Sequence, residues 1–173
     1  ELGYELYINI TEAKKIYEQI VEKGKKFNLS NCGMHALDTM RMESGFLHWG
    51  HDISPEENQY QAGLNFTISY KKDFNFIGRE ALEKIKDKQV DRRFAMFVLK
   101  NNDPGKPLLL YDEPIYKDNK IVGRTTSGNY SFNIKKNLAF GYINNDYSEN
   151  ELLNGNISIE IEKVKYTAEI IFK

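Results

Sequence analysis

The chain has 173 residues, enough to bury a core as one domain or as two small ones. Its 24 basic and 25 acidic side chains leave a net charge of -1, which excludes a general electrostatic attraction to nucleic acid or to an anionic membrane. A content of 40% hydrophobic and 13% aromatic residues excludes disorder of the whole chain. No apolar run is long enough to span a bilayer, and a single cysteine excludes an internal disulfide. We therefore expect a folded cytoplasmic protein.

The first elements predicted are a strand and a helix. Residues Leu2 to Ile10 alternate between apolar and polar side chains, which predicts a strand covered on one face. Thr11 is a suitable cap for a helix that continues to Lys23 and ends at Gly24. Because a domain rarely begins directly on a strand, we expect the chain to be a fragment of a larger protein.

The stretch from Cys32 to Asp52 contains the only cysteine, the only tryptophan and all three histidines. Its pattern predicts a helix from Gly33 to Ser44 that Gly45 ends, followed by an aromatic loop rich in histidine. Such a dense group of chemically active side chains indicates a site.

The next segment contains one more strand and one more helix. Residues 53–61 are predicted to be a loop, Leu64 to Tyr70 a strand, and Phe76 to about Asp87 a helix. The pattern then changes to strands alone. We place a domain boundary here, with one domain at residues 1–90 and the other at residues 91–173.

The second domain is predicted to be an antiparallel barrel or sandwich. Two-residue turns at Asp118-Asn119 and Glu162-Lys163 predict hairpins. The expected strands are Arg93 to Lys100, Leu108 to Tyr111, Glu113 to Lys117, Lys120 to Thr126, Leu138 to Ile143, Asn156 to Glu162 and Lys165 to Phe172.

The histidines and the cysteine raise the possibility of a metal or thiol site. Structural zinc sites use paired ligands at short spacing, and only His48 and His51 approach that pattern. We therefore interpret His35 as an exposed helical residue and Cys32 as a small buried residue, and we expect no metal.

Two other groups of residues are candidate sites. Gly123 to Gly128 lacks the GK[ST] signature of a phosphate-binding loop, so we interpret it as a turn between strands. Arg41, Glu43 and Trp49 are stronger candidates, because a guanidinium can bind a carboxylate and an indole can stack on a ring. The alternative is that Arg41 and Glu43 form salt bridges and that Trp49 fills the core.

Together these segments resemble the aminomethyltransferase family. The family includes the glycine cleavage T-protein and the tetrahydrofolate-binding halves of dimethylglycine and sarcosine dehydrogenases. The sequence HWGHDISPEENQYQAGL is more similar to the dehydrogenase branch. The matching segments, in the order of the family, are Glu1 to Leu6, Met40 to Asp52, Phe76 to Leu82 and Gly123 to Ile143.

The resemblance implies an α+β fold, in which the end of a mixed α/β folate-binding domain precedes a small antiparallel β-barrel. It implies that the cofactor is tetrahydrofolate, with Glu1 on the pterin ring and Arg41, Trp49 and His51 near the folate. Thr126, Ser127 and Gly128 match the family in position, without a defined role. The catalytic aspartate of the family has no counterpart in this chain, so no catalytic residue is assigned.

The function implied is transfer of a one-carbon unit from a small amine-derived substrate to tetrahydrofolate. The missing N-terminal part of the same protein is the expected partner, and the chain alone is expected to be inactive. FAD, if used, would bind an upstream domain, because this chain lacks GxGxxG. The alternatives are a stand-alone T-protein, a non-catalytic folate-binding or scaffold module, and a demethylase of sulfur compounds.

Overall fold

The computed structural model describes residues 3–100 and 103–172. The chain forms two compact units that divide after Met34. Among the described residues, no helix combines the length and the apolar character that crossing a membrane would require.

The first unit consists mainly of α1 (Ile10–Gly24), followed by the short 3-10 helix η1 (Lys25–Phe27). Asn9 caps α1, because its side-chain oxygen accepts the backbone N–H of Thr11 at 3.2 Å. The predicted strand before this helix is wrong: residues 3–9 form no strand, and Tyr4 is 85% exposed. The alternation there has no neighbouring strand among the described residues on which to pack.

The second unit begins at His35, the second residue of α2 (Met34–Glu43), and continues with a long connection to the barrel. This connection contains the 3-10 helix η2 (Asn65–Thr67) and the short helix α3 (Arg79–Glu83). The predicted strand at residues 64–70 is wrong, and the predicted helix is shorter than expected. Phe66 is 71% exposed, so the alternating pattern again lacks a sheet to cover.

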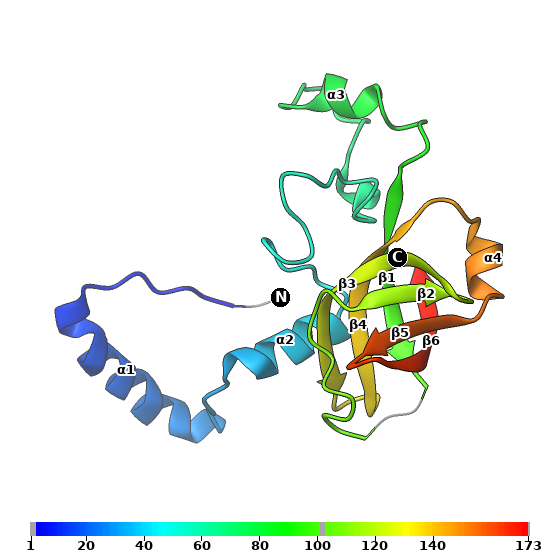
Figure 1. Cartoon of the computed structure of the whole chain (residues 1–173). Helices are drawn as coiled ribbons and strands as arrows, with labels where there is room; N and C mark the ends of the chain where they lie inside the picture. The colour runs from blue at the N-terminus through cyan, green and yellow to red at the C-terminus, as the bar shows by residue number, and fades with distance from the viewer. Residues whose placement is uncertain (1–2, 101–102, 173) are drawn as a thin grey trace. The chain divides into compact units, whose positions relative to one another are not determined.

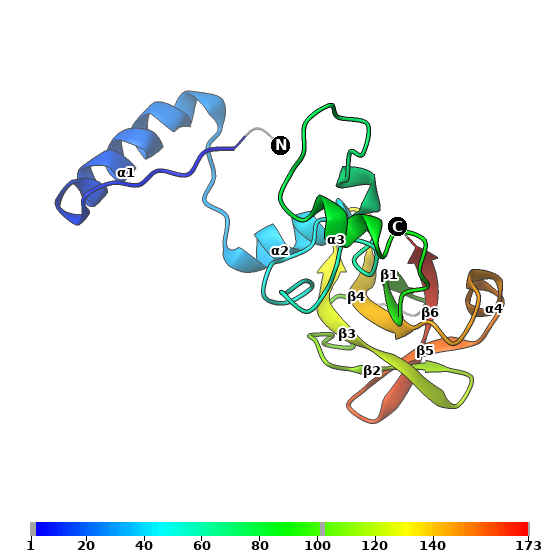
Figure 2. The ribbon, with the colours of Figure 1, turned by 90° about the horizontal axis from the view of Figure 1, so that it is seen from above.

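Six antiparallel strands close into a barrel in the order β1-β4-β3-β2-β5-β6 (Figures 1 and 2). This confirms the expected C-terminal β-barrel. The strands are β1 (Arg92–Leu99), β2 (Pro114–Lys117), β3 (Lys120–Ser131), β4 (Lys136–Asn144), β5 (Ile157–Ile161) and β6 (Val164–Phe172), and α4 (Glu149–Leu153) lies between β4 and β5.

Both predicted hairpin turns are confirmed. Asp118 between β2 and β3 has a φ of 55°, and Glu162 and Lys163 between β5 and β6 have φ values of 51° and 66°. Left-handed backbone of this kind matches the twist of the flanking strands.

The barrel wall carries apolar side chains on both faces. Phe97, Ile115 and Ile159 are fully buried in the cluster that fills the interior. A second cluster joins Phe140 of β4 to Met42 of α2. Because side chains alternate along a strand, this second cluster lies on the outer face, and it is where α2 packs against the barrel.

Two predictions near β3 are wrong. Residues 108–111 form no strand, and β3 continues through the predicted turn to Ser131. A Cβ placed on Gly128 would lie 1.8 Å from Leu109 Cδ2 and 2.8 Å from the Leu109 carbonyl carbon. Leu109 is 3% exposed, so the glycine allows the segment before β2 to pack directly on β3.

We expect Gly128→Ala to destabilise the fold by about 1–3 kcal/mol, because the added methyl group overpacks Leu109. Urea unfolding followed by tryptophan fluorescence measures the change. Gly33→Ala is the matched control, since nothing lies within 4 Å of a Cβ there. Equal unfolding midpoints for the two variants would contradict the proposed packing.

Candidate functional site

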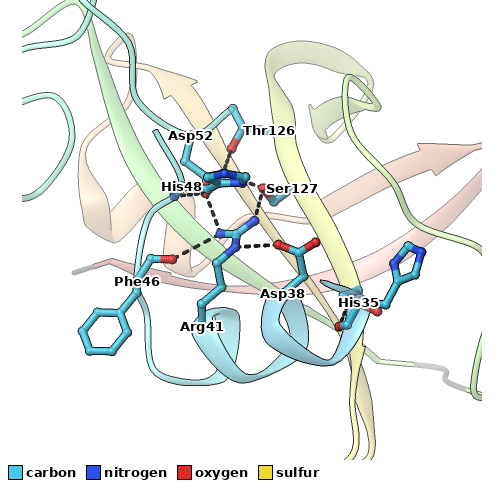
Figure 3. Close-up of polar contacts among 9 residues, drawn as sticks. His35, Asp38, Arg41, Phe46, His48, Asp52, Thr126 and Ser127 are labelled. Carbon is cyan, nitrogen blue, oxygen red and sulfur yellow. Dashed lines mark hydrogen bonds and ion pairs between the residues drawn. The ribbon is translucent and has the colours of Figure 1, made fainter. Parts of the chain in front are cut away.

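Arg41 of α2 is the centre of a buried polar network (Figure 3). Its Nε donates to Asp38 Oδ1 at 2.8 Å, and its Nη1 donates to Asp52 Oδ2 at 2.7 Å and to the Phe46 carbonyl at 3.2 Å. Its Nη2 donates to Ser127 Oγ at 2.9 Å. Four of the five N–H groups of the guanidinium are therefore used within the protein.

Asp52 is the anionic partner that organises this network. Its side chain is completely buried, and each carboxylate oxygen accepts two hydrogen bonds. Oδ2 binds Arg41 and the His48 backbone N–H at 2.8 Å, while Oδ1 binds Thr126 Oγ1 at 2.6 Å and Ser127 Oγ at 2.7 Å. This number of donors offsets the cost of burying the charge.

A bulge in β3 allows two successive side chains to reach Asp52. The register with β4 shifts between Thr125 and Ser127. Side chains of a regular strand alternate between faces, so without the extra residue Thr126 and Ser127 would point to opposite sides. The predicted turn is therefore a bulged strand that anchors the 46–52 loop to the barrel.

The loop is also held through its backbone. Tyr142 Oη of β4 donates to the Asp52 carbonyl at 2.9 Å. Burial is the main cause that raises the pKa of Tyr142, so this phenol stays protonated and remains a donor.

A cavity of about 260 Å³ lies beside this network. We call it the histidine pocket, because all three histidines of the chain line it. The rings of His48 and His51 lie 4.8 Å apart, and His51 is 6.4 Å from the Tyr111 ring. Asp38, Arg41, Leu108 and Leu110 also line it.

Within residues 3–100 and 103–172, no group of three His, Cys, Asp or Glu side chains has the geometry to hold a metal ion.

A larger cavity of about 570 Å³ lies on the other side of Asp52. Apart from Glu56, its acidic residues and arginines are already in ion pairs: Arg92 with Glu57 at 2.8 Å, Arg124 with Asp112 at 2.5 Å, and Asp52 with Arg41 at 2.7 Å. We therefore regard the smaller pocket as the better candidate site.

The sequence-derived candidates fall into different settings. Trp49 is 64% exposed, so the alternative that it fills the core is wrong. His51 is exposed at the histidine pocket. Cys32 is exposed, which corrects its interpretation as a buried residue. Glu1 lies outside the described residues.

Glu43 has a structural role. It accepts hydrogen bonds from Ser131 Oγ at 2.6 Å and from the backbone and side chain of Asn133. The Ser131 hydroxyl is the main cause that lowers the pKa of Glu43. These contacts fasten the end of α2 to the β3–β4 turn.

Asp38 and Asp52 were missed by the sequence analysis. Asp38 precedes Arg41 by one helical turn, a spacing that could have suggested an ion pair. Asp52 contacts Thr126 and Ser127, which lie more than 70 positions later in the sequence, and no local pattern reveals such a contact.

Comparison with known proteins places the chain in a family. Residues 1–72 match the model described as the GCVT N-terminal domain, and residues 92–173 match the glycine cleavage T-protein C-terminal barrel domain. The chain belongs to the glycine cleavage T-protein family. Both parts of the family's fold are thus represented.

Several known proteins resemble the chain over most of its length. Dimethylglycine dehydrogenase of Rattus norvegicus is 34% identical over 99% of this chain and 19% of its own. The 4-methylaminobutanoate oxidase of Paenarthrobacter nicotinovorans is 35% identical over 98% of this chain and 20% of its own. An aminomethyltransferase of Symbiobacterium thermophilum is 34% identical over 83% of this chain and 37% of its own. The chain spans about a fifth of the length of the first two relatives.

A solved T-protein structure has the same fold. The glycine cleavage system aminomethyltransferase T from Bartonella henselae superposes with a TM-score of 0.76 at 18% identity. The match covers 94% of this chain and 43% of that one.

We expect Asp52→Asn to destabilise the second unit by about 3–5 kcal/mol, because it removes one partner of a buried ion pair. Urea unfolding measures the loss. The control is Asp112→Asn, in the exposed Arg124–Asp112 pair, which should cost less than about 1 kcal/mol. Similar losses in both variants would show that the Asp52 network adds no special stability.

We expect Glu43→Gln to lower stability at neutral pH by about 1 kcal/mol through weaker hydrogen bonds. Because folding lowers the pKa of Glu43, its carboxylate stabilises the fold above the ordinary value of 4.5, and this contribution fades as the pH falls below that value. Unfolding midpoints from pH 7 to pH 3 test this: the two proteins should converge in acid. In a Ser131→Ala background the pH dependence should shrink, and an unchanged dependence would contradict the assignment.

Proposed function

We propose that the chain is part of an enzyme that transfers a one-carbon unit from an N-methylated amine to tetrahydrofolate. Family membership across residues 1–72 and 92–173 carries this proposal. The names of several relatives contain N-methylated amino acids, namely dimethylglycine, sarcosine and 4-methylaminobutanoate. An amine of this class is accordingly the donor.

Oxidation of the amine to its methylene iminium form removes a hydride, which an acceptor outside this chain, such as a flavin, would take up. The transfer that follows balances without a further reactant. The carbon exchanges its bonds to the amine nitrogen for bonds to two folate nitrogens. The two protons that leave those nitrogens depart on the amine, so charge is conserved. Protein groups contribute by orienting the reactants and by excluding water from the reactive carbon.

Groups suited to a folate lie on the loop and helix around Asp52. Arg41 retains one N–H on Nη2, which can donate to a carbonyl or carboxylate oxygen of the ligand. The exposed face of Trp49 can stack on a flat ring, and His51 adds a polar group at the pocket. A cavity of about 260 Å³ is too small for a whole folate, so most of that ligand would extend over the adjoining surface.

The test is a titration of the protein, expressed from its complete gene, with 5-formyltetrahydrofolate, a stable reduced folate. We expect Trp49→Ala to weaken binding about tenfold, equivalent to about 1.4 kcal/mol, through loss of ring stacking. Phe132→Ala is the matched control, because Phe132 is also an exposed aromatic residue, at 71%. Folate affinity should be unchanged in this control.

The same protein should move the labelled methyl carbon of dimethylglycine or sarcosine to tetrahydrofolate. Absence of both folate binding and transfer would refute the proposal and favour a scaffold module. Folate binding without transfer from any methylated amine would favour the non-catalytic folate-binding alternative.

A further inference from the structure

Asp38 presents an unused acceptor to the histidine pocket. Its Oδ1 accepts Arg41 Nε at 2.8 Å, whereas no described residue donates a hydrogen bond to its Oδ2. The side chain is 35% exposed, so it is accessible from the pocket that it lines. Figure 3 shows the carboxylate of Asp38 between Arg41 and His35.

The charges around the pocket favour a cation at Asp38. Two carboxylates, Asp38 and Asp52, face one guanidinium, which leaves one negative charge when the histidines are counted as neutral. Asp52 is completely buried and both of its oxygens are saturated. The excess charge is therefore accessible to a ligand only through Asp38.

Arg41 cannot act as a two-pronged clamp for a ligand carboxylate. Nε and Nη1 are fully used, and Nη2 keeps one free N–H. Its geometry is fixed from both sides, because Ser127 Oγ accepts from Nη2 and donates to Asp52. In the pocket, Arg41 serves mainly to hold the Asp38 carboxylate in one orientation.

The size and the walls of the pocket suit a small methylated ligand. About 260 Å³ is below the range of roughly 300–1,000 Å³ that is usual for larger ligands. Leu108 and Leu110 line the pocket and are 61% and 50% exposed, so they offer apolar surface to a methyl group.

We propose that Asp38 binds the protonated nitrogen of the methylated amine that the transfer releases, with Arg41 as its positioning residue. This inference rests on the proposed function for the identity of the amine. The ammonium N–H donates to Asp38 Oδ2, and the N-methyl group contacts the leucines.

The test compares two probes of nearly equal shape, sarcosine and methoxyacetate. The second replaces the ammonium group by an ether oxygen, which has neither charge nor N–H. All three histidines line the pocket, so their imidazole NMR signals in the 173-residue chain report binding there. We expect sarcosine to shift these signals with at least tenfold higher affinity than methoxyacetate.

Asp38→Asn should remove this preference by lowering sarcosine affinity at least tenfold, with methoxyacetate binding unchanged. The asparagine keeps an oxygen for Arg41 Nε, so the network geometry is preserved. Asp112→Asn, an exposed carboxylate that does not line this pocket, is the control and should keep the full preference. The comparison of the two probes on the unmodified protein needs no variant and stands even if Asp38→Asn unfolds.

Equal affinities of the two probes for the unmodified protein would overturn the inference, as would a preference that survives Asp38→Asn. So would the absence of sarcosine binding. The folate titration separates this inference from the proposed function. Folate binding without a sarcosine preference refutes the inference alone, whereas a sarcosine preference without folate binding supports Asp38 and refutes the folate proposal.

Discussion

A buried carboxylate with four hydrogen-bond donors determines the local structure around the candidate site. Removing the charge of Asp52 from water costs several kcal/mol, and only a complete set of donors can offset that cost. Those donors come from α2, from the 46–52 loop and from β3. Each of these segments must therefore be in place before the ion is stable, so the network gives the site a single geometry.

The barrel and the site depend on each other through this network. Met42 packs on the outer barrel wall one residue beyond Arg41, so apolar burial places the guanidinium where Asp52 can meet it. The bulge in β3 then supplies two hydroxyl groups on one face. In a regular strand these two hydroxyl groups would lie on opposite faces, and only one of them could reach Asp52.

The elements were predictable where local pattern and tertiary environment agree. The strand predicted at Leu138 to Ile143 and the hairpin predicted at Asp118-Asn119 are correct, because a neighbouring strand is present in each case. Residues 64–70 carry an alternating pattern but have no sheet beside them, so the strand predicted there is wrong. The resemblance of four segments to one family identified the fold more securely than periodicity did.

The candidate site was only partly predictable. Arg41 stood out for its chemistry, but its true partners were hidden, because Asp52 and Ser127 are separated by 75 positions. The bulge places the side chains of Thr126 and Ser127 on the same face of β3. The sequence does not predict it, because it shows only a run of hydroxyl residues there. Asp38 became informative only when its second oxygen was seen to lack a donor among the described residues.

Closure of the barrel has a consequence for how other molecules can be recognised. Each of the six strands is hydrogen-bonded on both sides, so this sheet has no free edge to which an incoming peptide could add as a further strand. The same closure protects the domain from strand exchange between copies. Recognition at the barrel must therefore use side chains and loops, which is where evolution can change ligand preference without altering the sheet.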